Sequence, residues 1–148
     1  MSKKVDVSDK IKDITELVAD NRISVKEVQD LSNIDYPLFS FKYLHKISYN
    51  ESKETSFFIS FLQRLQKLSE LGWKNIRTSH RHAYGLEKIP ISQLNANIKN
   101  FPPFITPEVK ELDVFRATGD NRTFVGFQKN KVFHILFIEA TFGDICTH

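Results

Sequence analysis

The sequence predicts one small α+β domain in which an antiparallel sheet packs on one long helix. Residues 54–71 carry a continuous apolar stripe, which indicates an amphipathic helix. Residues 111–139 alternate apolar and polar side chains between two turns, which favours a C-terminal three-stranded β-meander. The chain has 148 residues and is 41% hydrophobic and 26% charged, so it can bury one real core. We expect an N-terminal helical hairpin over residues 1–35 and the α+β domain over residues 36–148.

Composition limits the environments and cofactors that suit this chain. No run approaches the ~18 apolar residues of a membrane span, and the start MSKKVDVSDK lacks the apolar stretch of a signal peptide, so we expect a cytoplasmic protein without membrane contact. Cys146 is the single cysteine, which excludes an internal disulfide or a thiolate metal cluster within one chain. The net charge of +3 permits a polyanionic partner without requiring one.

The first 35 residues predict two short helices. Ile11, Ile14 and Leu17 recur at helical spacing within residues 8–19, and Ser24 followed by Glu27 has the spacing of a capping box that begins a helix over residues 24–32. The pair is similar to the start of a helix-turn-helix. However, the chain becomes extended at 35–37, where a DNA-binding domain would need a third packed helix. We interpret the pair as a hairpin that packs on the main domain or on a partner.

The middle of the chain predicts a strand, a long helix and a connector. Residues 38–44 alternate as a strand does, and the helix over 54–71 ends at Gly72. A short strand over 86–90 and a brief helix over 91–99 follow. The apolar stripe of the long helix is expected to comprise Phe58, Phe61, Leu62, Leu65 and Leu68.

The last third predicts the three strands of the meander. They are ELDVFRA over 111–117, RTFVGFQ over 122–128 and VFHILFIE over 132–139, and the third is apolar enough for a central strand. The turns fall at 118–121 and 129–131, where Gly, Asp and Asn occur.

This order of strand, long helix, connector and meander, ending in DVFRATGDNRTFVGFQKNKVFHILFIEATFGD, resembles the RelE/ParE-like toxin superfamily over about residues 36–142. The resemblance implies a small bacterial or phage-related toxin with a cognate antitoxin protein as partner. In the RelE branch it implies an mRNA endoribonuclease that acts on the ribosome, and in the ParE branch a protein that acts on DNA gyrase. Arg122 matches the arginine that these toxins use near the scissile phosphate, and Arg116 matches a position that is frequently basic. The final stretch EATFGDICTH lacks the basic or aromatic C-terminal residue common in the family, unless His134 or His148 replaces it.

Residues 77–88, RTSHRHAYGLEK, hold the densest group of proton-transfer and cationic side chains. Cleavage of RNA without a metal requires a base, an acid and cations around the phosphorus. The catalytic candidates are Arg122, His82, His80, Arg81 and His134, and the RNA-binding candidates are Arg116, Tyr84 and Lys88.

Each of these residues also has a structural interpretation. A His-x-His pair on a loop is commonly a surface feature, and the other histidines are too scattered to complete a zinc site, so we expect no metal and no cofactor. His134 suits a satisfied histidine within a sheet, and Tyr84-Gly85 suits a turn. An acid such as Glu139 or Asp113 would give Arg116 or Arg122 a structural role.

Two functional hypotheses follow. The first is a toxin-like, metal-independent mRNA endoribonuclease whose partner is RNA or the ribosome. The second is a non-enzymatic protein-interaction module on the same fold, which would use residues 1–34 for docking. The spatial relation of Arg122 to the 77–88 loop distinguishes them.

Overall fold

The computed structural model describes residues 33–50, 54–81, 83–95, 101–103 and 105–145. The chain divides into two compact units, residues 1–34 and residues 35–148, and the second is described below. The helices expected over 8–19 and 24–32 lie outside the described residues, as do His82, Cys146 and His148. No helix within the described ranges has the length and apolarity to cross a membrane.

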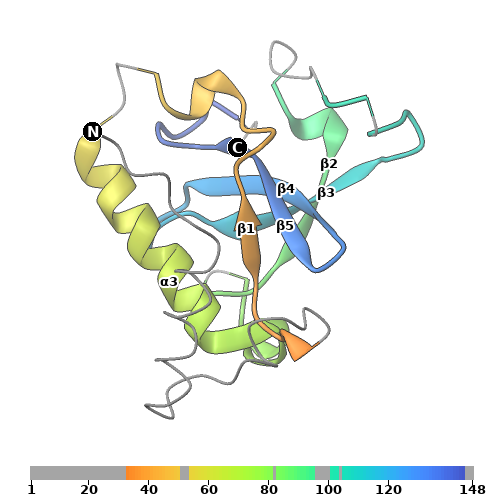
Figure 1. Ribbon diagram of the computed structural model, residues 1–148. Helices are drawn as coiled ribbons and strands as arrows, with labels where there is room; N and C mark the ends of the chain where they lie inside the picture. Colours follow the sequence, from red (N-terminus) through yellow and green to blue (C-terminus); the bar gives the residue numbers. More distant parts are fainter. Residues whose placement is uncertain (1–32, 51–53, 82, 96–100, 104, 146–148) are drawn as a thin grey trace, which may run out of the picture. The chain divides into compact units, whose positions relative to one another are not determined.

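A five-stranded mixed sheet forms the centre of the domain (Figure 1). Its order is β1-β5-β4-β3-β2, with bounds Leu38–Ser40, Val132–Ile138, Thr123–Lys129, Glu111–Arg116 and Glu87–Pro90. The strands β2, β3, β4 and β5 pair antiparallel, whereas β1 runs parallel to β5. The α+β class is confirmed, but the prediction of a wholly antiparallel sheet is wrong at β1. An alternating pattern reports which residues face a core and carries no information on strand direction.

The strand β5 is an interior strand next to the β1 edge, and its two halves have different partners on the β1 side. The expected strand over 38–44 ends at Ser40, so only the first half of β5 pairs with β1. In the second half, the His45 amide donates to the Leu136 carbonyl at 2.8 Å, and the Ile138 amide donates to Ser48 Oγ at 3.0 Å. These bonds satisfy backbone groups that would otherwise be buried without a partner.

The long helix α3 spans Thr55–Thr78 and lies against one face of the sheet (Figure 1). Gly72 interrupts it, with φ 75° and ψ 163°, and the Trp73 amide donates to the Asp35 carbonyl at 2.7 Å. The predicted helix end at Gly72 is therefore confirmed, and the prediction lacked only the second helical stretch, which continues through Thr78. Gly72 breaks the helix, since that conformation suits only a residue without a Cβ.

The buried stripe of α3 differs from the predicted one at Leu62. Its fully buried apolar residues before the break are Phe57, Phe61, Leu65 and Leu68. Phe58 is partly buried, and Leu62 is 68% exposed. The segment 57–62 has more apolar residues than one helix face can bury, so spacing alone did not select between Phe57 and Leu62.

Two cores flank the sheet. The first lies between α3 and the sheet and contains Phe115, Phe124 and Phe133, whose rings meet in edge-on and stacked pairs 5.1–6.0 Å apart. The second contains Val114, Val125 and Leu136, against which partly buried residues of the 91–109 segment pack. In that segment the predicted helix over 91–99 is wrong at its start, because a 3₁₀ turn, η3, covers only Ile91–Gln93 and Leu94 is extended. Residues 96–100 lie outside the described residues.

Candidate functional site

The turn between β3 and β4 is organised by one carboxylate. Asp120 accepts hydrogen bonds from Thr118 Oγ1 and from the Arg122 amide, both at 2.8 Å. The Ala117 amide donates to the Arg122 carbonyl at 2.9 Å and closes the turn. An Asp that bonds the amide two residues further on stabilises a turn without help from the rest of the fold. The sequence TGDNR therefore fixes the position of Arg122 locally.

The Arg122 side chain is held on three sides. Its Nε and one terminal nitrogen lie 2.9 Å from Asp120 Oδ2, and its other terminal nitrogen donates to the Ala140 carbonyl at 2.9 Å. The guanidinium carbon sits 4.4 Å from the centre of the Phe57 ring. These contacts use three of the five N–H groups of a guanidinium, so two remain for a ligand. A group fixed in this way loses little conformational freedom on binding.

Arg122 lines an open cavity of about 510 Å³. Asn121 and Thr141 add polar groups to its wall, and Phe142 adds a ring that is 53% exposed. The remaining lining residues are Glu54, Asp120 and Ala140. This cavity therefore combines a positioned cation, hydrogen-bonding groups and an exposed aromatic ring.

The ion pair with Arg122 affects the titration of Asp120. Burial raises the pKa of Asp120, but hydrogen bonds from Arg122 and from Thr118 lower it by more, so the pKa lies below its ordinary value. Asp120 is consequently ionised at neutral pH. The acid that pairs with Arg122 is thus Asp120, whereas the sequence suggested Glu139 or Asp113 as the partner. Glu139 is fully buried and accepts bonds from the Thr123 and Gly143 amides, both at 3.3 Å.

Arg116 lies on the opposite face of the sheet from Arg122. It follows Val114 with period two, and Val114 belongs to the second core, whereas Arg122 rests on Phe57 of the first core. Its guanidinium lies 3.4 Å from Glu87 Oε1 and donates to the Asn121 carbonyl at 3.2 Å. With a side chain only 11% exposed, Arg116 serves mainly to join β2, β3 and the turn.

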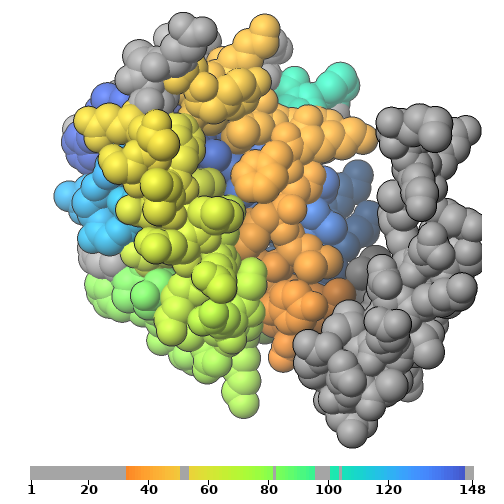
Figure 2. Space-filling model, turned by 60° about the vertical axis from the view of Figure 1, so that its left-hand side comes forward, coloured from red at the N-terminus to blue at the C-terminus, as the bar shows by residue number. Residues whose placement is uncertain are grey.

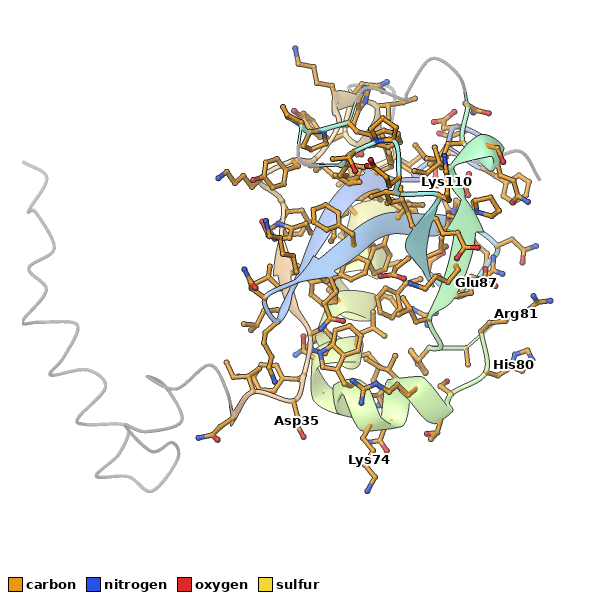
Figure 3. The ribbon with its side chains drawn as sticks, turned by 90° about the vertical axis from the view of Figure 1, so that its right-hand side faces the viewer. Asp35, Lys74, His80, Arg81, Glu87 and Lys110 are labelled. Atoms are coloured by element: carbon orange, nitrogen blue, oxygen red, sulfur yellow. The ribbon has the colours of Figure 1, made fainter. Side chains whose placement is uncertain are left out.

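The loop after α3 carries His80 and Arg81, and their side chains point away from the body of the domain (Figure 3). The His80 carbonyl accepts the Ala83 and Gly85 amides at 2.9 and 3.0 Å, so this residue shapes the loop through its backbone. Arg81 lies 3.7 Å from Glu87 and is 63% exposed, a geometry that contributes little stability. Glu87 thereby brings Arg81 and Arg116 together, and neither lines the Arg122 cavity.

Two predicted RNA-binding residues of this region lie apart from each other. Lys88 pairs with Asp113 at 2.7 Å on the strand β2. Tyr84 packs against the first core, and the Arg64 guanidinium lies 4.5 Å from its ring centre. Tyr84 lines a second, smaller hollow on the other side of the turn from Arg122.

His134 lies on the second-core face, within an aromatic group. Its ring stacks on Phe127 at 5.0 Å and meets Tyr43 at 5.5 Å, and both neighbours pack against the second core. Burial, followed by the charges of Lys129 and Lys42, lowers the pKa of His134, which is therefore neutral at pH 7. Among the described residues, its buried Nδ1 has no hydrogen-bond partner.

Arg122 and His134 do not share a site. His134 pairs across the sheet with Phe127, which is five residues from Arg122 along the chain, or roughly 16 Å at ~3.3 Å per residue. They also lie on opposite faces of the sheet. The expectation that Arg122, His134 and the 77–88 loop form one proton-transfer site is not met by the described residues of that set.

Sequence reasoning missed several residues around the turn, of which Asp120, Arg64 and Phe142 are the most important. Arg64 had a detectable signal, because Ser60, Arg64 and Lys67 recur at helical spacing on the flank of α3. Asp120 also had a detectable signal, because an Asp two residues before Arg122 can accept a hydrogen bond from the Arg122 amide within a turn. Within the described ranges, no group of three or more His, Cys, Asp or Glu side chains is arranged to hold a metal ion.

Comparison with protein-family models, with curated proteins and with solved structures finds no match for this chain. The resemblance to RelE/ParE-like toxins therefore stays a prediction.

Proposed function

We propose that this domain binds single-stranded RNA at the cavity lined by Arg122. The observation that supports the proposal is a guanidinium held by Asp120, Ala140 and Phe57 with two N–H groups left for a ligand. A planar guanidinium suits the oxygens of a phosphate. The exposed ring of Phe142 in the same cavity suits stacking by an unpaired base, which is how proteins commonly contact single-stranded RNA.

Cleavage of that RNA, as in a toxin-like endoribonuclease, requires a base at the same place. Glu54 lines the Arg122 cavity, and its carboxylate is a suitable acceptor for a 2′-hydroxyl proton. In this reaction the 2′-oxygen attacks phosphorus, the 5′-oxygen leaves with a proton from water, and Arg122 stabilises the charge on the phosphorane. From the sequence, His80 or His82 was expected to carry the proton, but His80 points away from the domain (Figure 3) and His82 lies outside the described residues.

RNA binding is tested by fluorescence anisotropy with a labelled single-stranded oligoribonucleotide and its duplex. We expect Arg122→Ala to weaken binding to the single strand roughly 10- to 100-fold, the value of a charge-assisted hydrogen bond. The slope of log K against log salt should fall by about 0.7. Arg122 also joins the β3–β4 turn to Ala140, so Arg122→Ala removes a structural contact as well as a ligand group. Phe142→Ala changes an exposed residue of the same cavity and avoids this effect. Lys74→Ala, on the far part of α3, is the matched control. Binding by both cavity variants at the wild-type level, with unchanged melting temperatures, would refute the proposal.

Cleavage is tested in the same preparations by incubating mRNA with ribosomes, and in cells by growth after induction. Glu54→Gln should abolish cleavage and growth arrest while leaving RNA affinity within about twofold, because it removes a proton acceptor and keeps the shape of the side chain. Intact mRNA in the wild-type reaction would exclude the enzymatic activity and leave an RNA-binding domain.

A second candidate function is protein interaction, and it rests on a different face. In Figure 2, α3 runs beside the 35–50 segment on one side of the domain. Three large apolar side chains from these segments are exposed: Ile59 by 59%, Leu62 by 68% and Phe41 by 48%. Aromatic and aliphatic groups of this kind provide the anchors of protein interfaces.

The two candidates predict different variants. If the domain docks on a protein, one partner should co-purify with the full chain at fixed stoichiometry and be lost from an Ile59→Ser, Leu62→Ser double variant that still binds RNA normally. A wild-type chain that purifies without such a partner would count against this second function.

A further inference from the structure

A second hollow of about 270 Å³ lies on the flank of α3, separated from the Arg122 cavity by the β3–β4 turn. Its lining residues are all polar, cationic or glycine, and none is a carboxylate. They are Ser60, Gln63, Arg64, Lys67, Tyr84, Thr118 and Gly119. Such a lining is unsuited to an apolar ligand and favours an anion.

The lining residues come from three segments of the chain that meet at this hollow. Four lining residues are at positions 60, 63, 64 and 67 of α3, and helical residues three, four and seven apart share one face. Thr118 and Gly119 approach from the β3–β4 turn, and Tyr84 approaches from the loop after α3. A Cβ on Gly119 would meet nothing within 4 Å, so the backbone of the turn is open to a ligand or solvent at this residue.

Arg64 is positioned and partly dehydrated. One terminal nitrogen donates to the Ala83 carbonyl at 2.7 Å, and the guanidinium lies over the Tyr84 ring. Burial lowers the pKa of Arg64, while Tyr84 and Asp120 raise it by less. Within the described part of the chain, Arg64 has no carboxylate at ion-pair distance. Its charge is therefore only partly compensated.

We propose that this hollow is a binding site for a phosphate group. Arg64 provides a planar fork for two phosphate oxygens, and the Lys67 ammonium provides a second positive charge. The Ser60 hydroxyl and the Gln63 amide provide neutral donors on the same helix face. Two cations suit a phosphomonoester, with a charge of about −1.5 to −2 at pH 7, better than a singly charged carboxylate.

The site is independent of RNA binding at the Arg122 cavity, because it requires only the phosphate group. The phosphate can belong to the free anion or to a nucleotide, and these sources share one recognition chemistry. Inorganic phosphate and adenosine monophosphate therefore serve as two separate probes, and adenosine serves as the probe without phosphate.

Binding is measured on the full chain by titration of amide resonances at constant ionic strength. We expect saturable shifts of the Gly119 backbone amide and the Gln63 side-chain amide with phosphate or the monophosphate, and none with adenosine. Lys67→Gln removes an exposed charge without touching the core, and it should weaken binding roughly 3- to 10-fold, a range typical of one partly exposed charge pair. Arg64→Lys, which keeps the charge and loses the fork, should weaken binding further.

The controls separate this site from other sources of binding. Lys74→Gln removes one charge from the far part of α3 and should leave the phosphate affinity within about twofold of wild type. Tighter binding of the monophosphate than of free phosphate would identify a nucleotide-type ligand, and equal binding would identify the free anion. Unsaturable shifts, or an affinity that Lys67→Gln and Arg64→Lys leave unchanged, would overturn the proposal.

Discussion

Gly126→Ala should destabilise the domain severely, because Gly126 of β4 lies against the backbone of β5. The register between β4 and β5 shifts here: Val125 pairs with Phe137, and Gly126 pairs with Ile135, so Leu136 is an extra residue on β5. A Cβ on Gly126 would lie 2.0 Å from the His134 carbonyl oxygen and 2.8 Å from a ring carbon of Phe133. Cβ atoms in real structures essentially never lie within 3.0 Å of such a neighbour, so β4 and β5 would have to separate by about 1 Å.

The cost of this separation has two parts. Overpacking of a filled core typically costs about 1–3 kcal/mol, and loss of one or two ladder hydrogen bonds adds roughly 1 kcal/mol each. We therefore expect a loss of about 3–4 kcal/mol, or a fall of more than about 10 °C in melting temperature, measured by urea and thermal unfolding.

Gly119→Ala is the matched control, because nothing lies within 4 Å of its Cβ position. That change should leave stability within about 0.5 kcal/mol or raise it slightly by restricting the unfolded chain. A Gly126→Ala protein within about 0.5 kcal/mol of wild type would show that the two strands do not approach each other in this register.

Three further predictions test the helix face, a histidine and a buried acid. Leu65→Ala should cost about 2–4 kcal/mol, whereas Leu62→Ser should change the free energy of unfolding by less than about 0.5 kcal/mol, because the two side chains are 7% and 68% exposed. The lowered pKa of His134 means that the unfolded chain binds a proton at higher pH than the folded domain, so melting temperature should fall as pH drops below about 6.5, less steeply in His134→Gln. Glu139→Gln should lower the free energy of unfolding in urea by about 1–3 kcal/mol. The two carboxylate oxygens accept hydrogen bonds from the Thr123 and Gly143 amides, and the NH₂ group of glutamine would place a donor against one of these donors.

The C-terminal strands illustrate what sequence pattern can determine. Strands were expected over 111–117, 122–128 and 132–139, and β3, β4 and β5 begin and end within one residue of those bounds. The strands are recognisable because alternation and turn chemistry act locally. Asn130 and Lys131 both have positive φ, at 52° and 70°, as a two-residue hairpin turn with the twist of the flanking strands requires.

The parallel pairing of β1 could not be predicted in the same way. β1 and β5 are separated by about ninety residues of chain, and a three-residue strand such as Leu38–Ser40 has no pattern that specifies its partner. The buried face of α3 was ambiguous for a related reason. Several apolar residues near its start compete for one face, and only the shape of the sheet selects Phe57 over Leu62.

The candidate site was predictable one residue at a time and not as an arrangement. Arg122 was identified through the resemblance to RelE/ParE-like toxins, but its acid was sought in neighbouring strands and is instead Asp120 in the adjoining turn. His134 was identified from its chemistry, but the sheet separates it from Arg122, because His134 pairs with Phe127, which is an odd number of residues from Arg122 and so faces the other side. Convergence of side chains is a property of the tertiary fold, and a motif within one segment does not report it.

The β3–β4 turn explains why both proposed anion sites occur at one end of the domain. Asp120 holds Arg122 in its cavity, and its charge also acts on Arg64 across the turn. One carboxylate thus moderates two guanidinium groups that face different hollows. Asp120 therefore orders Arg122 by direct contact, whereas Arg64 is ordered by the Ala83 carbonyl and the Tyr84 ring and keeps its positive charge for a ligand.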